Sequence, residues 1–148
     1  MNYCTQDDIA ARITLEMLIQ LSDDSIPPSQ VDGVVLGAVV AEVGEIIDGH
    51  LRGRYTLPLA PLPPLLTSIA CDLAAYKLWA RRPETHGEPP KTVVKDEKDA
   101  RQMLRMIQSG KLTLGERDSP DPEPRAAEYR TSKRPEDREF PAHVLNRF

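Results

Sequence analysis

The chain has 148 residues, of which 40% are apolar but only 5% aromatic, and its net charge at neutral pH is −4. This length suits one domain with an aliphatic core. The acidic balance argues against a protein that grips nucleic acid through a basic surface. Residues 1–115 hold 12 Lys and Arg against 15 Asp and Glu, and residues 116–148 hold 7 against 8, so neither part is a basic arm.

The two cysteines, Cys4 and Cys71, have neither a metal-ligand spacing nor a disulfide framework. We expect Cys71 to be a small buried thiol in an apolar helix, and the protein to work in a reducing compartment. The first residues, MNYCTQDDIAARI, lack the apolar stretch of a signal peptide, and no apolar run reaches the ~18–20 residues that a membrane span needs. The expected location is therefore the cytosol, in soluble form.

The N-terminal part predicts two short helices and a turn. Thr5 and Asp8 form a capping-box pattern that begins a helix at about residues 6–13, and LEMLIQLS follows as a second helix after Thr14. Asp23, Asp24 and two prolines then break the chain. This acidic cluster lacks the glycine and the distal glutamate of a calcium-binding loop, so we interpret it as turn and N-cap chemistry.

Residues 29–52 predict the longest helix. Ser29 to Asp32 resembles a second capping box, and apolar residues recur every three or four positions and indicate a buried stripe: Val35, Val39, Val43, Ile46, Ile47 and Leu51, widened by Val31, Val34 and Ala38. The opposite side carries Glu42, Glu45, Asp48 and Arg52, of which the last two are an i,i+4 pair. Three glycines (Gly33, Gly37 and Gly44) lower helix propensity and so favour a close approach by another helix or subunit.

A stiff apolar connector, the strap (residues 52–66), leads to the next helix. It places four prolines within seven residues, at 58, 61, 63 and 64, and alternates them with leucines. Pro64 can begin a helix over 64–81, in which Asp72, Lys77 and Arg81 should face solvent. Four arginines flank these elements: Arg52, Arg54, Arg81 and Arg82. They are expected to cap helix ends and form ion pairs between subunits, and a phosphate or DNA contact is the alternative.

The last part changes in character along its length. Residues 83–90 predict a loop, 91–109 a further helix with its end at Ser109-Gly110, and 111–115 a brief strand or extended piece. Residues 116–148 are rich in proline and mixed charge, which is typical of an extended or disordered segment. They also hold Tyr129, Phe140, Leu145 and Phe148. Two interpretations stay open: a tail with incidental aromatics, or an arm that docks on a neighbouring subunit or partner.

No arrangement of residues predicts catalysis. The three histidines (His50, His86 and His143) stand in different contexts and show no metal-ligand spacing, and no glycine-rich phosphate loop follows a strand. A joint site of His50 with Asp48 and Glu45 is disfavoured, because His50 is turned away on the helix. We expect no enzyme activity, no cofactor and no bound metal.

The strap and its flanking helices resemble a known family. The residues that carry the resemblance are Ile47-Asp48-Gly49, Leu51, Gly53-Arg54-Tyr55, Leu57-Pro58-Leu59, Pro63-Pro64-Leu65-Leu66, Ala70-Cys71-Asp72-Leu73-Ala74, Tyr76, Leu78 and Arg81-Arg82-Pro83, with Tyr3, Thr5, Asp8, Arg12 and the LIQLSD run before them. Over about residues 3–115 the chain resembles the head-to-tail connector, or adaptor, proteins of Mu-like phages and prophages. Residues from 116 onwards depart from that pattern.

The resemblance implies an all-α connector fold without catalytic residues. In related connectors many copies, typically twelve, form a ring under the portal protein, and DNA passes through the lumen as cargo. By this resemblance the chain is a virion protein of the head–tail junction, assembled in the host cytoplasm, with the portal and a tail or tail-terminator protein as neighbours. The acidic residues Glu42, Glu45 and Asp48 are a candidate lumen face.

The overall prediction is a small bundle of about four helices with one long central helix, residues 1–115, and a C-terminal arm, residues 116–148. Its function would be that of a structural virion protein; the alternative is a small intracellular helical binding or DNA-linked regulatory module. Subunit or partner contacts are expected from the strap and the arm, at Arg52, Arg54, Tyr55, Leu57, Leu59, Leu62, Tyr129, Phe140 and Phe148.

Overall fold

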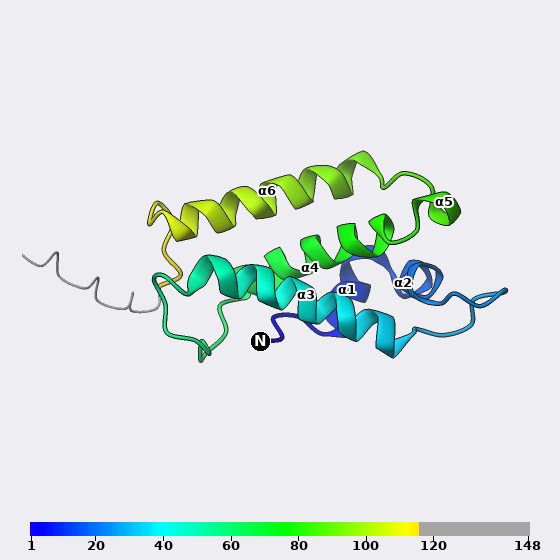
Figure 1. The fold of residues 1–148 in the computed structure, drawn as a ribbon, viewed down its shortest axis with the longest axis horizontal. Coiled ribbons are helices and arrows are strands. Elements are labelled where there is room, and N and C mark those ends of the chain that lie inside the picture. The colour runs from blue at the N-terminus through cyan, green and yellow to red at the C-terminus, as the bar shows by residue number, and fades with distance from the viewer. Residues whose placement is uncertain (116–148) are drawn as a thin grey trace, which may run out of the picture.

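The computed structural model describes residues 1–115, which fold into six helices without a strand (Figure 1). They are α1 (Gln6–Ile13), α2 (Leu15–Ser22), α3 (Gly33–Leu51), α4 (Pro64–Ala80), α5 (Pro83–His86) and α6 (Lys91–Gln108). The predicted all-α bundle is confirmed. The described part holds more helices than the overall count of about four, because the two short N-terminal helices, each predicted at its place, count separately and residues 83–86 add one turn.

The two N-terminal helices begin as their caps predict. The Thr5 hydroxyl accepts a hydrogen bond from the Asp8 amide, and the Asp8 side chain accepts one from the Thr5 amide, so the capping box is confirmed. Thr14 separates α1 from α2 with a φ of 68°, a left-handed backbone that few non-glycine residues adopt. Its hydroxyl accepts from the Met17 amide and caps α2, which turns the chain sharply between the two helices.

Helix α3 begins at Gly33, four residues later than predicted. Asp32 is the N-cap, and its carboxylate accepts hydrogen bonds from the amides of Val34 (2.8 Å) and Val35 (3.2 Å). The predicted capping box at Ser29 is wrong, because the Ser29 and Gln30 amides donate to Asp23 instead. Asp23 therefore organises the turn, as expected. The Ser25 hydroxyl, followed by the Ser29 and Ser25 amides, holds the pKa of Asp23 well below its usual range.

Helix α4, and not the longer α3, lies at the centre of the bundle. It contacts all five other helices, and it buries side chains on most of its circumference: Leu66, Ile69, Ala70, Cys71, Leu73, Ala74, Ala75 and Leu78. The expectation of three solvated polar residues on this helix is therefore wrong. Asp72, Lys77 and Arg81 are only partly exposed, and Asp72 lies 2.6 Å from the Arg12 guanidinium of α1.

Cys71 is buried, as predicted, and Cys4 from the N-terminal segment is buried with it. The neighbouring Cys71 side chain, followed by burial, raises the pKa of the Cys4 thiol. The proximity of the two thiols could not be predicted from the sequence, because positions 4 and 71 are far apart in the chain. The buried Cys4 thus fixes the first residues of the chain against the central helix.

The C-terminal helices close the bundle. Residues 83–86, which were expected to lie in a loop, form the single turn α5. Helix α6 follows its prediction closely and buries Ala100, Leu104 and Ile107; Gly110, with a φ of 78°, follows its last turn. Residues 111–115 form no strand, although Leu112 and Leu114 pack against the core.

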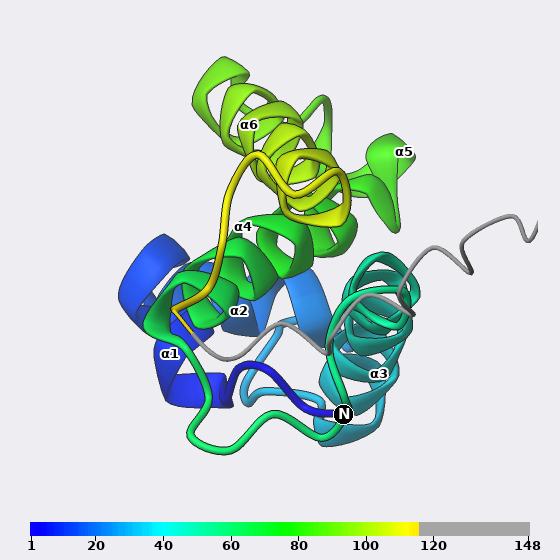
Figure 2. The same cartoon turned by 90° about the vertical axis from the view of Figure 1, so that its left-hand side faces the viewer.

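The helices form two sides around α4. Figure 2 shows α6 on one side of α4 and α1 and α3 on the other. Because α3, α4 and α6 run back and forth along the long axis, the strap lies at the same end of the molecule as the C-terminal end of α6 (Figure 1). The turn between α2 and α3 and the single turn α5 lie at the opposite end.

Candidate functional site

The strap packs part of its side chains onto its own bundle and leaves others exposed. Tyr55 is only 3% exposed and Leu59 6%, whereas Leu57 and Leu62 are half-buried. The Tyr55 hydroxyl accepts a hydrogen bond from the Leu114 amide (3.2 Å). Tyr55 and Leu59 thus belong to the core of a single copy, and their predicted contact with a partner stays a prediction.

The four arginines lie at opposite ends of the molecule. Arg54 donates to the carbonyl of Ile107 (2.7 Å) at the last turn of α6, and Arg52 is exposed, 3.5 Å from Glu45. Arg81 and Arg82 lie one helix length away, roughly 25 Å for the 17 residues of α4. The four side chains therefore form no single cluster.

The expected capping role of these arginines is confirmed at two of them. Arg81 donates to the carbonyls of Leu21 (3.0 Å) and Ser22 (3.3 Å), which end α2. Arg54 does the same for α6. Cations suit these positions, because the carbonyls at a helix C-terminus carry partial negative charge. Arg81 and Arg82 also pair with Asp24, and the Arg81 contact lowers the pKa of the Asp24 carboxyl.

One of the three residues in the predicted acidic face of α3 is buried. Glu42 and Glu45 are exposed, but Asp48 is 6% exposed and points inward. Its carboxylate accepts hydrogen bonds from the Tyr3 hydroxyl and from the Met1 amino group (3.1 Å). Asp48 therefore does not form the predicted i,i+4 pair with Arg52. It anchors the N-terminal segment, and its place in an exposed acidic face was predicted wrongly.

The outward face of α3 is covered by small and apolar residues. Gly33, Gly37, Ala38 and Ala41 are exposed, as is Val34 at 83%, which was expected to widen the buried stripe. A Cβ atom at Gly33 or Gly37 would meet nothing within 4 Å. At Gly44 the same atom would lie 2.3 Å from the Met1 carbonyl oxygen. One of the three glycines thus permits a close approach, by the N-terminal segment.

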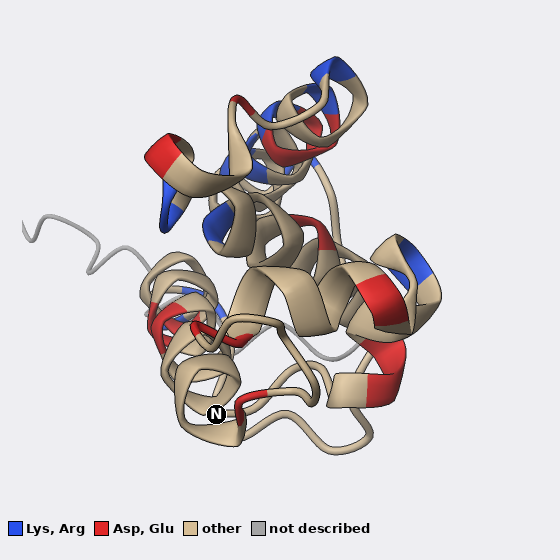
Figure 3. Ribbon diagram, turned by 90° about the vertical axis from the view of Figure 1, so that its right-hand side faces the viewer, with Lys and Arg blue, Asp and Glu red and all other residues tan. Residues whose placement is uncertain are grey.

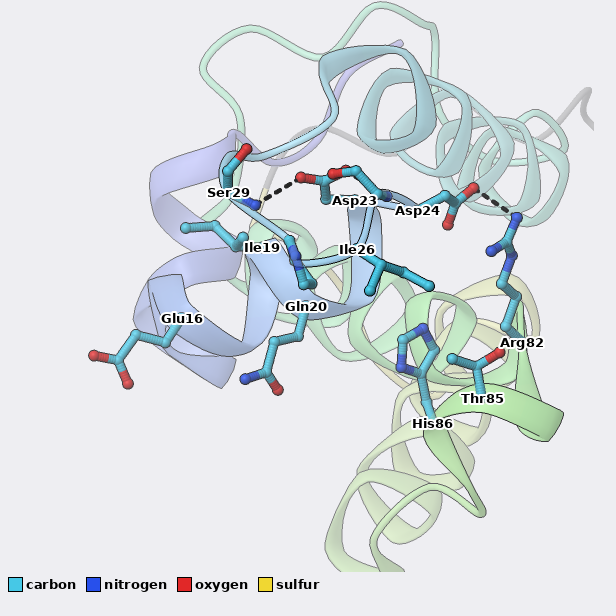
Figure 4. A pocket seen from close by; sticks show the side chains of 12 residues that line it. Glu16, Ile19, Gln20, Asp23, Asp24, Ile26, Ser29, Arg82, Thr85 and His86 are labelled. Carbon is cyan, nitrogen blue, oxygen red and sulfur yellow. Dashed lines mark hydrogen bonds and ion pairs between the residues drawn. The ribbon is translucent and has the colours of Figure 1, made fainter.

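A hollow of about 610 Å³ lies between α2, the following turn and α5 (Figure 4). Ile26 stands at the turn with 98% of its surface exposed, and Figure 4 shows His86 and Thr85 across from Glu16 and Gln20. Asp23 and Asp24 also line it, but both carboxylates are held by the turn and by the arginines.

The described residues contain no group of three or more His, Cys, Asp or Glu side chains placed to hold a metal ion. His50, the histidine nearest to the acidic residues of α3, contacts Gln108 through Nδ1 at 2.8 Å.

Comparison with known proteins fits this picture of a helical scaffold. Residues 3–133 match the family model described as "Bacteriophage Mu, Gp36". The chain belongs to this family. It is 30% identical over 115 residues to "Gene product J" of Escherichia phage Mu, covering 78% of this chain and 77% of that protein. It is 28% identical over 114 residues to "Mu-like prophage FluMu protein gp36" of Haemophilus influenzae, covering 76% and 75%.

The match confirms the predicted resemblance to a Mu-like phage family. Within residues 1–115 of this Gp36-family chain, no helix is both long and apolar enough to pass through a bilayer. The predicted contact residues Tyr129, Phe140 and Phe148, and Leu145, lie outside the described residues.

Two large apolar residues of this Gp36-family protein are exposed at positions where the sequence predicted no contact surface. Ile26 lies in the turn after α2 and is 98% exposed, and Leu15, the first residue of α2, is 51% exposed. The Ile-Pro-Pro triplet contained a usable signal, because an isoleucine between polar turn residues and two prolines has no helix or strand in which to be buried. Leu15 gave no such signal, since its exposure depends on how α2 packs.

Proposed function

We propose that this phage-family protein is a structural component of the virion, a head-to-tail connector whose copies assemble into a ring between the portal and the tail. The observation that carries the proposal is the pairing of family membership with a rigid helical body that presents apolar side chains outward. The exposed Gly33, Val34, Gly37, Ala38 and Ala41 follow one another along one side of α3, and a contiguous apolar face is typical of surfaces that meet another protein.

The partners follow from this role. Neighbouring copies would meet through the outward faces of the bundle, and the portal and a tail or tail-terminator protein would contact the two ends of the ring. By analogy with connectors, the ring would hold about twelve copies and DNA would pass through its lumen as cargo. The protein would assemble in the host cytoplasm and remain at the head–tail junction of the virion.

We also infer that the protein catalyses no reaction. Catalysis needs a nucleophile or base that an orienting group positions next to a substrate. Around the 610 Å³ hollow, Asp23 holds the turn and Asp24 binds two arginines. These carboxylates serve the fold and are not free to act as a general base.

Electron microscopy of the full-length protein, alone and mixed with the portal protein encoded by the same phage, tests the proposal. We expect rings of one diameter that attach coaxially to the portal, and light scattering should report one discrete mass. A protein that stays monomeric in the presence of both the portal and the tail protein would contradict the connector role.

A DNA-linked regulatory module is the second candidate, and one observation favours it. The outward face of α6 carries a row of exposed cations, which a phosphate backbone could contact. Filter binding to duplex DNA separates the two functions. Tight binding that weakens steeply with added salt would favour the regulator, whereas a cargo-passing connector should bind weakly.

A further inference from the structure

The outward face of α6 is cationic along its length. Lys91, Lys95, Lys98 and Arg105 recur every three, four or seven residues, and all are exposed. They therefore share one side of the helix, opposite the buried Ala100, Leu104 and Ile107. From the first to the last, the row spans about 21 Å at 1.5 Å per residue.

An apolar hollow lies within this row. Pro89 and Val94 line an open depression of about 380 Å³, and Lys91, Lys95 and Lys98 surround it together with Glu88. Three ammonium groups face one carboxylate there, so the rim carries a positive charge. Such a hollow suits a small aliphatic side chain that has carboxylates beside it.

An aliphatic side chain with a carboxylate beside it lies on the other side of the same chain. Leu15 is half exposed at the first turn of α2, and Glu16 next to it is exposed as well. Figures 1 and 2 show α6 on one side of α4, and α2 with α1 on the other, and Figure 3 shows acidic residues on the N-terminal helices and both signs of charge on α6. Residues 1–48 hold nine Asp and Glu and one Arg, whereas residues 91–111 hold six Lys and Arg and three Asp and Glu. The N-terminal segment therefore carries net negative charge and the α6 segment net positive charge.

We propose that Leu15 and Glu16 of one copy dock into the Pro89–Val94 hollow of the next copy, with Glu16 among Lys91, Lys95 and Lys98. This inference rests on the proposed ring. Because the two surfaces differ and lie on opposite sides of one subunit, the contact is head-to-tail, which is the kind that generates rings. An apolar centre with a charged rim is the usual anatomy of an interface, and complementary charge speeds association and fixes its register.

A charge swap between two variants of the full-length chain tests this contact. Lys95→Glu/Lys98→Glu reverses the rim, and Glu16→Lys reverses the docking residue. Each variant alone should associate about tenfold or more weakly than the unchanged protein, because like charges then meet across the interface. An equal mixture of the two should restore association, since every contact between unlike copies pairs opposite charges again. Lys111→Glu, an exposed charge reversal outside the hollow, is the matched control and should have no effect.

Carbodiimide cross-linking of a mixture of ¹⁴N- and ¹⁵N-labelled protein, at millimolar concentration, detects the contact even where association is weak. Mixed-isotope peptides that join Glu16 to Lys91, Lys95 or Lys98 are expected. Their absence, or a mixture of variants that associates no better than each alone, overturns the proposal. So does salt-steep binding of duplex DNA that the Lys95→Glu/Lys98→Glu variant loses, because the cations would then serve nucleic acid.

The connector function and the contact between Glu16 and the α6 lysines can be disproved separately. If rings form on the portal and none of these substitutions changes them, the connector function stands and the assigned contact is wrong. If neither rings nor portal complexes form, the connector function fails, whatever cross-links appear.

Discussion

Asp48 is the residue whose environment differs most from its sequence context. A carboxylate that follows Glu42 and Glu45 on the same helix is expected to face solvent. Asp48 is instead buried and accepts hydrogen bonds from Tyr3 and Met1, which precede it by 45 and 47 positions. A buried charge is tolerated only where it is paired and hydrogen-bonded. The Tyr3 hydroxyl and the Met1 amino group meet that condition.

Removing the charge of Asp48 should destabilise the fold. Asp48→Asn keeps the size of the side chain but weakens the contacts with the Met1 amine and the Tyr3 hydroxyl. We expect a loss of about 1–3 kcal/mol in the free energy of unfolding, measured by urea denaturation at neutral pH. Glu45→Gln, on the exposed side of the same helix, should change it by less than about 0.5 kcal/mol. Equal effects of the two substitutions would contradict the burial of Asp48.

Tyr3 predicts a loss of stability at alkaline pH. Burial and the Asp48 contact raise the pKa of Tyr3 above the value of 10.0 that an unperturbed tyrosine has. A group with a raised pKa in the folded state contributes its full stabilisation below the unfolded value and loses it as the pH rises beyond that value. The free energy of unfolding should therefore fall above pH 10. In denaturation curves recorded between pH 8 and 11, Tyr3→Phe should fall less steeply, and an identical slope would count against the raised pKa.

At the scale of the elements, the glycines of α3 differ in their surroundings. Gly44 faces the N-terminal segment, where a Cβ atom would come within 2.3 Å of a carbonyl oxygen, whereas Gly37 faces open space. The Met1 backbone cannot move away from a Cβ atom at Gly44 without a cost in free energy, because the contacts with Asp48 hold the N-terminal segment in place. The same substitution should thus have opposite effects at two positions of one helix.

Gly37→Ala should stabilise the isolated protein by about 0.4–1 kcal/mol, through higher helix propensity and a less flexible unfolded chain. Gly44→Ala should destabilise it, because the N-terminal segment must shift away from α3. Thermal or urea unfolding of both variants provides the comparison. Gly44→Ala as stable as Gly37→Ala would mean that the N-terminal segment does not lie on the helix.

The strap joins α3 to α4 and also holds the end of α6. Tyr55→Phe removes the oxygen that accepts from the Leu114 amide while retaining the buried ring. We expect faster hydrogen exchange at residues 112–115, a loss of about 0.5–1.5 kcal/mol in the free energy of unfolding, and unchanged exchange in α4. Equally fast exchange throughout the bundle would show that the ring packs differently.

At the scale of the whole molecule, the described residues 1–115 share one hydrophobic core. Buried side chains from the N-terminal segment, from the strap and from α1 to α4 and α6 form one cluster. We therefore expect a chain ending at residue 115 to fold around this core. The function assigned to Tyr129, Phe140 and Phe148 can be tested without disturbing the bundle.

Deleting residues 116–148 should leave a folded helical domain with cooperative unfolding, while ring or portal assembly weakens. Circular dichroism measures the first outcome, and sedimentation with electron microscopy the second. If assembly is unchanged by the deletion, the C-terminal segment is not a docking arm.

Local patterns in the sequence determined much of the fold. The Thr5–Asp8 capping box, the apolar period of α6, its glycine stop and the helix behind Pro64 all depend on residues a few positions apart, so the all-α class followed from the sequence. The resemblance carried by the strap was likewise readable without coordinates, and the family match confirmed it.

The tertiary structure decided which faces are buried. Asp48 lies inward because Met1 and Tyr3 return to α3, Tyr55 because Leu114 crosses it, and α4 is central because helices pack on most of its sides. Leu15 and Ile26 remain exposed for the corresponding reason, since no other segment within residues 1–115 covers them. Burial is a property of contacts between residues that are tens of positions apart, and helical periodicity gives the spacing of a face without saying what will lie against it.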